Sequence, residues 1–299
     1  MPPPLPVSVI IPYYNHAESL RDTIDSVLSQ SQPPSEIVFL DDASPIPLSE
    51  TAPSLVSEAS QNVTIILRRH SQNGGAAAAR NTGIEISSQP FLAFLDADDT
   101  WKPQKLERQF PELQDATTNN HLPVASVTGF DLPGSYVVAN QPARVGLVPR
   151  GAKTLAEFSS GCWYCPGSTL MVHRSFFEKV GLYDEALRRF EDYELFLRAG
   201  RNQCELRVSP DILATINSSP SRDRHAPDSS LDHIEQQHGP WMNGNDRAAL
   251  HRMRAYFALE QAASQIRRGN PIAGAMAMAR SWWHHPRLSA QVIDRWQHK

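Results

Sequence analysis

Short apolar runs alternate with amphipathic segments along the first part of the chain. Residues 7–11 form a mostly β-branched run that ends at Pro12, and this pattern predicts a buried strand. In residues 18–30 the apolar positions recur at helical spacing, which predicts a helix with Asn15 as its N-cap. The same patterns predict strands at 36–40, 63–67 and 91–95 and an Ala-rich helix at 74–86.

Strands that alternate with helices indicate βαβ units, and therefore an α/β fold with a mostly parallel, Rossmann-like sheet flanked by helices. Ligands bind such sheets beyond the carboxyl ends of the strands. Three predicted strands end in distinctive polar segments, namely Pro12-Tyr13-Tyr14-Asn15, Asp41-Asp42 and Asp96 to Asp99. We expect these segments to meet at one edge of the sheet and to form one site there.

The later part of the chain has weaker patterns and ends in a helical tail. Residues 120–160 are irregular, with Gly, Pro and short β-rich pieces, and 217–230 predicts a polar loop. Further strands are predicted at 169–172 and 207–216, and further helices at 174–180, 191–200 (ending at Gly200), 246–268, 271–284 and 288–297. We therefore expect an α/β domain over 1–230 and a helical appendage over 231–299.

Composition narrows the class of protein. With 299 residues, 40% of them apolar, the chain can bury a sizeable core, and its net charge of −4 gives no broad electrostatic case for binding nucleic acid. Three cysteines suit a reducing compartment, and the pair Cys162 and Cys165 lacks the second pair that a zinc site needs. No secretory signal or apolar run long enough to span a membrane is present, so we expect a cytoplasmic protein.

The segment 91–100 is the most informative stretch, because an apolar run leads directly into Asp96, Asp98 and Asp99. Three neighbouring carboxylates repel one another, and desolvation adds to the cost. A divalent cation with oxygen ligands would offset that cost and bring a phosphorylated ligand with it. An aspartate after a strand is often only a turn former or helix cap, but that alternative explains two separate clusters poorly.

Other polar positions have a functional and an ordinary interpretation. Tyr13 and Tyr14 could form an aromatic wall for a nucleobase or pack in the core. The turn at 73–75 is a weak candidate for phosphate binding, and Arg80 could hold the carboxylates by ion pairing. Glu191 and Asp192 could take part in catalysis, or they could only stabilise the macrodipole at the start of a helix. A basic loop that contains Arg222, Arg224 and His225 could close over a diphosphate.

Taken in order, these segments resemble the inverting glycosyltransferases of family 2, which have the GT-A fold. The resemblance covers roughly residues 5–227, and each piece is modest alone whereas the ordered set is specific. The matching pieces are Val7 to Asn15, Thr23 to Gln30, Val38 to Ser44, Asn73 to Asn81, Phe94 to Asp99, Gly181 to Glu185, and Glu191-Asp192. Two departures are Ala43, where many relatives have glycine, and the segment 221–229, which matches the family's Arg/His loop only loosely.

The resemblance implies a hexosyltransferase-type enzyme that uses a nucleotide-sugar donor, with UDP favoured, and a glycan, lipid-linked or other hydroxyl acceptor. It implies that Mn²⁺ or Mg²⁺ is held by Asp98, with His225 as a second ligand, and that Asp192 is the general base. Residues implied in donor binding are Pro12, Tyr14, Asn15, Asp42, Arg80, Asp96 and Glu191, with Asp42 at the uracil and Asp96 on the ribose side.

Two alternatives from other classes stay open on the sequence. The segment Leu95 to Thr100 also fits the D-x-D-x-T motif of haloacid-dehalogenase-like phosphatases, with Asp96 as nucleophile and Asp98 as acid. That motif normally follows the first strand of its domain, whereas here three strands precede it. A non-catalytic nucleotide-sugar binder would keep Asp42 and Asp98 but would not need Asp192.

The tail allows one further contact. Apolar and basic residues lie close together in it, namely Met276, Ala279, Trp282 and Trp283 with Arg280, His284, His285 and Arg287. They could rest on a membrane surface, in which case the protein would be peripheral at the inner face of the membrane. Packing on the α/β domain, or a dimer contact, is the favoured alternative. The sequence does not distinguish donor sugars, acceptors, Mn²⁺ from Mg²⁺, or oligomeric states.

Overall fold

The computed structural model describes residues 2–53, 63–119, 123–138, 141–162, 166–217 and 228–288. Its strands are β1 (Leu5–Tyr13), β2 (Pro34–Asp41), β3 (Thr64–Arg69), β4 (Phe91–Phe94), β5 (Thr100–Trp101), β6 (Val124–Val138), β7 (Gln141–Leu147), β8 (Met171–His173) and β9 (Glu205–Thr215). Its helices are α1 (Ala17–Leu28), α2 (Leu48–Thr51), α4 (Gly75–Ile86), α5 (Lys105–Asn119), α6 (Leu155–Phe158), α7 (Pro166–Thr169), α8 (Ser175–Val180), α9 (Glu191–Arg201), α10 (Asp228–Asn245), α11 (Arg247–Arg267) and α12 (Pro271–His284).

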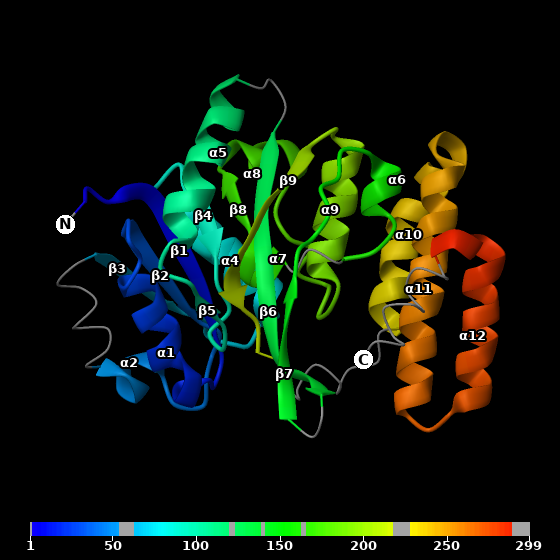
Figure 1. The fold of residues 1–299 in the computed structure, drawn as a ribbon, viewed down its shortest axis with the longest axis horizontal. Coiled ribbons are helices and arrows are strands. Elements are labelled where there is room, and N and C mark those ends of the chain that lie inside the picture. The colour runs from blue at the N-terminus through cyan, green and yellow to red at the C-terminus, as the bar shows by residue number, and fades with distance from the viewer. Residues whose placement is uncertain are drawn as a thin grey trace.

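One mixed sheet runs through the molecule in the order β3-β2-β1-β4-β8-β6-β9-β5, with β7 paired to β6 (Figure 1). The first four strands in this order are parallel, as the βαβ pattern predicts. Strand β8 is antiparallel to both β4 and β6, so the sheet is no longer purely parallel beyond β4. The parallel half therefore brings the carboxyl ends of β1, β2 and β4 to the same edge.

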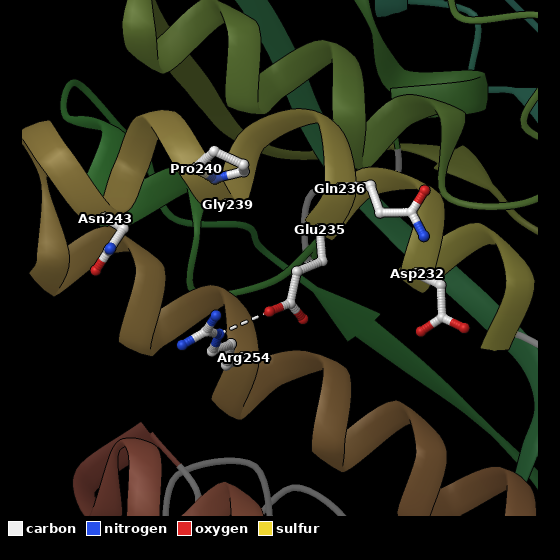
Figure 2. Close-up of a pocket in the computed structure, with 7 residues that line it drawn as sticks. All are labelled: Asp232, Glu235, Gln236, Gly239, Pro240, Asn243 and Arg254. Carbon is white, nitrogen blue, oxygen red and sulfur yellow. Dashed lines mark hydrogen bonds and ion pairs between the residues drawn. The ribbon is translucent and has the colours of Figure 1, made fainter.

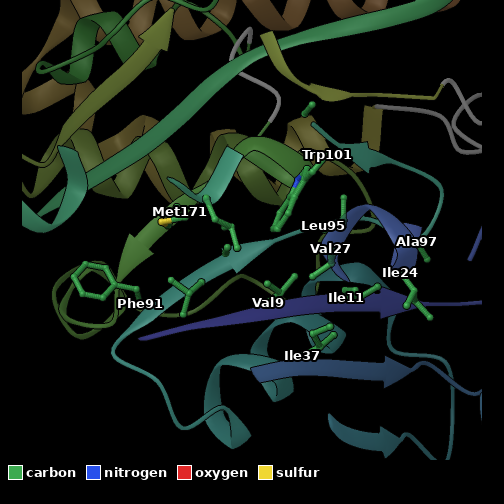
Figure 3. Close-up of a cluster of buried hydrophobic side chains, with 14 of the residues drawn as sticks. Val9, Ile11, Ile24, Val27, Ile37, Phe91, Leu95, Ala97, Trp101 and Met171 are labelled. Atoms are coloured by element: carbon green, nitrogen blue, oxygen red, sulfur yellow. The ribbon is translucent and has the colours of Figure 1, made fainter. Parts of the chain in front are cut away.

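Both faces of the sheet are buried, because alternate residues of β1 enter two different cores. Val9 and Ile11 join a cluster with Ile24 and Val27 of α1, which Figure 3 shows. The intervening Ile10 joins a second cluster with residues of α4, α8 and α9. Side chains of a strand point alternately to its two faces, so a continuous apolar run fits a sheet covered on both sides. The expected α/β architecture with flanking helices is confirmed.

Three local expectations were wrong. Helix α1 has His16, not Asn15, at its N-cap, and Asn15 instead takes a left-handed φ of 56° while its amide donates to Ser44 Oγ at 3.1 Å. Helix α9 does not end at Gly200 but continues one residue farther, to Arg201, and glycine is required at position 200 because a Cβ there would meet the Leu155 Cα at 2.8 Å. The stretch 120–160, expected to be irregular, contains the β6–β7 hairpin.

The tail helices α11 and α12 lie within one residue of their expected bounds, whereas a helix at 288–297 falls almost wholly outside the described residues. Helix α10 begins at Asp228, inside the segment expected to be a loop. A third apolar cluster joins Tyr193 and Leu197 of α9 to residues of α10 and α11. The tail therefore shares a core with the helix that carries Glu191 and Asp192.

Lys105 lies fully buried under the sheet and gives a pH-dependent prediction. Its Nζ donates to Gln109 Oε1 at 2.7 Å and lies 4.0 Å from the centre of the Trp101 ring. Burial lowers the pKa of Lys105 to about 7, against about 10.4 for an unfolded lysine. Between these values the unfolded chain binds more protons, so its free energy of unfolding should rise as the pH increases from about 7 to about 10.

We expect Lys105→Met to remove this rise, because the rise comes from the lysine that is protonated in the unfolded chain but neutral in the folded one between about pH 7 and about pH 10, and methionine does not titrate. Lys153→Met is the matched control, since the Lys153 side chain is largely exposed and pairs with Glu205 at 3.1 Å. Urea unfolding of both variants at about pH 7 and about pH 9.5 measures the effect. An unchanged pH dependence in Lys105→Met would show that another group causes it.

Candidate active site at the end of β4

The turn after β4 is held rigidly by the hydroxyls of α1. Thr23 Oγ1 donates to the carbonyl oxygens of Ala97 and Asp99, at 3.0 and 2.9 Å. Ser19 Oγ donates to the Ala97 carbonyl at 2.9 Å, and the Asp99 amide closes the turn on the Asp96 carbonyl at 3.1 Å. Hydrogen bonds from α1 side chains to the backbone of this turn therefore fix the positions of its three aspartates.

Asp99 is the structural member of the acidic cluster. Its side chain is buried and accepts hydrogen bonds from Ser168 Oγ of α7 and from the Asn217 amide, which follows β9. Burial and the nearby Asp96 carboxylate raise the pKa of Asp99 to about 8. Asp99 therefore ties α7 and the end of β9 to the turn, while Asp96 and Asp98 remain partly exposed.

Arg80 of α4 gathers the acids of two distant segments. Its guanidinium donates to Asp96 Oδ1 at 2.9 Å and to Glu191 Oε1 at 2.8 Å, and it lies 3.7 Å from Asp192 Oδ1. Burial alone would lower the pKa of Arg80, but Asp96, Asp192 and Glu191 together raise it well above its ordinary value. The ion-pairing role considered for Arg80 is what the structure shows, and this arginine brings Asp96 and Asp192 to one place.

The first turn of α9 carries Glu191 and Asp192, whose side chains are 14% and 18% exposed. Phe190, just before the helix, takes a left-handed φ of 63°, which is uncommon for an aromatic residue. Farther along α9, the buried Glu194 accepts hydrogen bonds from Arg198, and His238 Nε2 of α10 lies 2.9 Å from it. The acidic end of α9 is thus supported by Arg80 of α4 and by His238 of α10.

The Asp42 carboxylate accepts hydrogen bonds from the backbone amides of the turn that was a weak candidate for phosphate binding. The Gly74 and Gly75 amides donate to its two carboxylate oxygens at 2.8 and 2.7 Å, and His70 Nδ1 lies 2.8 Å from Oδ1. A phosphate at this turn would have to displace a carboxylate of the chain itself, so that interpretation is wrong for these amides. His70 had no sequence signal, because it lies 28 residues from Asp42.

The preceding aspartate, Asp41, has a structural role. Its carboxylate accepts from the Ser44 and Leu48 amides at 2.8 and 2.9 Å and pairs with Arg69. Burial works to raise the pKa of Asp41, but these hydrogen bonds outweigh it and lower the pKa below its ordinary value. Asp41 therefore shapes the turn that places Asp42.

The two tyrosines after β1 separate into different environments. Tyr13 is buried in the core of the sheet, so its proposed place in an aromatic wall is wrong, whereas Tyr14 is 46% exposed. Pro12 pairs with Leu40 across β1 and β2, and the Tyr13 carbonyl accepts from the Asp42 amide at 2.9 Å. Pro12, Tyr14 and Asp42 therefore lie at the same edge of the sheet, as the strand pattern predicted.

Within the part of the chain that the structure describes, Asp96 and Asp98 are the acidic residues to consider for a metal site. Arg222, Arg224 and His225 lie outside that part, as does Cys165. Among the described residues, no three His, Cys, Asp or Glu side chains are grouped to hold a metal ion. Magnesium usually takes only one or two protein carboxylates and completes its shell with water and phosphate oxygens. Two partly exposed carboxylates beside the buried Arg80 fit that kind of cation.

A hollow of about 510 Å³ lies elsewhere, on α10 and α11. Figure 2 shows its lining, which includes the ion pair between Glu235 Oε1 and Arg254 Nε at 2.7 Å. None of its lining residues belongs to the sites predicted from the sequence. The hollow is a feature of the tail helices and is separate from the residue set at the end of β4.

Arg80→Met is expected to lower the free energy of unfolding by about 2 to 4 kcal/mol, since it leaves Asp96 and Glu191 without their buried cation. Arg108→Met is the matched control, because Arg108 pairs with Asp211 at 2.7 Å on the surface and should contribute less than about 1 kcal/mol. Urea unfolding of both variants checks the difference. Equal losses in the two variants would contradict a bridging role for Arg80.

Comparison with known proteins gives one matching family model, described as glycosyl transferase family 2, over residues 8–181. The amylovoran biosynthesis glycosyltransferase AmsB of Erwinia amylovora is 28% identical over 200 residues, covering 65% of this chain and 64% of AmsB. The putative teichuronic acid biosynthesis glycosyltransferase TuaG of Bacillus subtilis is 36% identical over 126 residues, covering 42% and 47% of the two chains. An uncharacterized glycosyltransferase of Rickettsia felis is 29% identical, and the match covers 68% of this chain but only 32% of that protein.

Among solved structures, S. aureus TarS superposes with a TM-score of 0.63 at 18% identity, covering 96% of this chain and 53% of TarS. TarS 1–349 in complex with UDP-GlcNAc superposes with a TM-score of 0.58 at 15% identity, covering 96% of this chain and 91% of that one. Identities this low establish a shared fold. The likeness extends over the sheet and the tail helices alike.

Proposed function

The chain belongs to glycosyl transferase family 2, and we propose that it transfers a sugar from a nucleotide diphosphate sugar to an acceptor hydroxyl with inversion at the anomeric carbon. The observation that carries the proposal is the grouping of Asp96 and Asp192 around Arg80, next to Asp98 at the end of β4. That grouping sets a partly exposed acidic pair, suited to a metal and diphosphate, beside a second carboxylate that can accept a proton.

The donor's nucleotide is proposed to bind at the edge formed by β1, β2 and β4. Tyr14 offers an exposed ring for stacking on a base, and Asp42 and Pro12 lie at the same edge. Asp96 would face the ribose, and Asn15 and Glu191 would complete the donor-binding set. We favour a UDP-sugar, because TarS, which has the same fold, has been solved in complex with UDP and with UDP-GlcNAc.

The transfer step is a single displacement. Asp192 takes the proton from the acceptor hydroxyl while that oxygen forms a bond to the anomeric carbon. The bond between that carbon and the diphosphate oxygen breaks on the opposite face, so the configuration inverts. Asp98, with His225 as a further candidate ligand, would hold Mn²⁺ or Mg²⁺, and this ion stabilises the charge on the leaving diphosphate when it is bound.

The distances from Arg80 to the neighbouring acids help to choose between Glu191 and Asp192 as the base. Arg80 gives its shortest contacts to Asp96 and Glu191, at 2.9 and 2.8 Å, and lies 3.7 Å from Asp192. Glu191 therefore has one carboxylate oxygen engaged in a short hydrogen bond with Arg80, whereas Asp192 lies farther from that guanidinium. Of these two acids, Asp192 is the better placed to meet an acceptor hydroxyl, and Arg80 itself is a positioning residue.

We further propose that residues 1–230 form the transferase domain and that 231–299 form the helical appendage. The names of AmsB and TuaG support a role in the biosynthesis of a glycan or cell-surface polysaccharide. The acceptor would be a glycan, a lipid-linked sugar or another hydroxyl compound. We propose that the enzyme acts in the cytoplasm and that its tail can hold it at the inner face of the membrane. No helix within the described residues is long and apolar enough to cross a membrane.

A binding panel tests the donor assignment. Calorimetric titration with UDP-, GDP- and dTDP-sugars, each with Mn²⁺ or Mg²⁺, should reveal one preferred nucleotide whose affinity falls when the cation is removed. Asp42→Asn should weaken that binding, whereas the control Asp211→Asn, at an exposed ion pair, should not. Failure of every nucleotide sugar to bind would contradict the proposed function.

A further inference from the structure

One face of α12 is apolar and exposed over the length of the helix. Ile272, Met276 and Trp283 are 79%, 66% and 85% exposed, and their spacing places them on the same side of the helix together with Ala279. The adjacent Trp282 is 53% exposed. Isolated exposed apolar residues are common, but a row that contains one tryptophan and lies beside a second is a candidate interaction surface.

The opposite face of α12 is already in use within the chain. Gly274, Ala277 and Ser281 are buried, and a Cβ at Gly274 would meet the Ala262 carbonyl oxygen of α11 at 3.3 Å. Figure 1 shows α12 at the outer edge of the molecule, beside α11. Packing on the rest of the protein therefore explains one face of this helix and leaves the row of Ile272, Met276 and Trp283 unexplained.

The segment of sequence that contains α12 carries charge of one sign. Between Glu260 and Asp294 the sequence contains no acidic residue, although the whole chain has a net charge of −4. The same segment contains four arginines, Arg267, Arg268, Arg280 and Arg287. The segment that carries this apolar helix face is therefore net positive, which favours a partner that is both apolar and anionic.

A second copy of the chain fits this surface less well than a bilayer does. In a symmetric dimer the same patch meets itself, so the arginines beside the row would face their own counterparts. Like charges set opposite each other in an interface disfavour it. An anionic bilayer instead offers phosphate groups to the arginines and an apolar boundary to the tryptophans, which prefer membrane–water interfaces.

We propose that α12 lies flat on an anionic lipid bilayer, with Ile272, Met276 and Trp283 in the boundary between headgroups and acyl chains. Arg280 and Arg268 then contact lipid phosphates. The contact is peripheral, and it would hold the transferase at the surface where lipid-linked acceptors are found. The inference depends on α12 alone and does not rest on the sugar-transfer assignment.

Flotation of the full chain with vesicles tests the contact. We expect binding to phosphatidylcholine vesicles that contain about one third phosphatidylglycerol, and weaker binding to pure phosphatidylcholine. Met276→Glu and Trp283→Glu should each lower the bound fraction at least about tenfold, and Arg268→Gln and Arg280→Gln by about fivefold each. Val148→Glu, at an apolar residue that is 51% exposed on the α/β domain, is the matched control and should bind like the parent chain.

Two results would overturn the proposal. One is a parent chain that does not bind the anionic vesicles. The other is a Met276→Glu variant that binds them normally. Sedimentation analysis tests the alternative partner, a second copy of the chain. If the parent chain is a dimer that Trp283→Glu dissociates, and it does not bind vesicles, the row belongs to a dimer interface. Nucleotide-sugar binding should be the same in all these variants, so a failure of the membrane contact is distinguishable from a failure of the transferase assignment.

Discussion

Replacing Asp192 with asparagine should lower kcat for sugar transfer by about 10²- to 10⁴-fold, the range typical for loss of a general base. Asparagine has nearly the same shape but cannot take the proton of the acceptor hydroxyl. The donor KM should change little, because Asp192 is not among the residues proposed to bind the donor. Steady-state kinetics with a saturating donor and a varied acceptor measures both values.

Glu191→Gln is the matched control for this experiment, because it removes a carboxylate from the same helical turn. Glu191 accepts from Arg80 at 2.8 Å, so its loss should reduce stability as well as activity. The loss of kcat should be greater in Asp192→Asn than in Glu191→Gln, and only Asp192→Asn should remove the acidic limb of the pH–rate profile. Ordinary transfer by Asp192→Asn would exclude this aspartate as the base.

Asp98→Ala should abolish stimulation by Mn²⁺ or Mg²⁺ and lower kcat/KM by about 10²- to 10³-fold, comparable to the loss of one strong electrostatic contact to a developing charge. The physical reason is that Asp98 is the partly exposed carboxylate proposed to hold the cation against the diphosphate. Activity titrated with each cation, in the parent chain and in the variant, measures the effect.

The neighbouring Asp99 provides a control within the same turn. Asp99 is buried and accepts from Ser168 and Asn217, so Asp99→Asn should reduce the free energy of unfolding but keep the dependence of activity on the cation. Metal dependence that survives Asp98→Ala, or that is lost in Asp99→Asn alone, would contradict the division of roles between the two aspartates.

The grouping of strand ends could be predicted from the sequence, because it depends on local signals. Apolar runs identify β1, β2 and β4, and parallel strands place their carboxyl ends at one edge. The approach of Asp96 to the start of α9 has no such signal. It depends on Arg80, which contacts an acid 111 residues away, and on the path of the chain through β8. For this reason the role of Asp192 rested on family resemblance and not on periodicity.

The incorrect expectations share a physical cause: the same local sequence motif can be satisfied by different tertiary contacts. Amides at a helix start bind any anion, and at Gly74 and Gly75 the anion is Asp42 of the same chain. Gly200 follows the pattern of a helix end, but it is required where α9 approaches Leu155 closely. The separate role of Asp99 could not be predicted from the sequence, because its partners, Ser168 and Asn217, lie 69 and 118 residues away.

The most direct test of the central claim is the product released in turnover. The purified chain is incubated with its preferred nucleotide sugar and a divalent cation, and separately with a phosphomonoester. The account predicts release of a nucleoside diphosphate from the sugar donor, lost in Asp192→Asn and Asp98→Ala, with no phosphate from the monoester. Release of phosphate from the monoester, with Asp96 needed and no nucleoside diphosphate formed, would contradict the account and assign the acidic turn after β4 to a phosphatase.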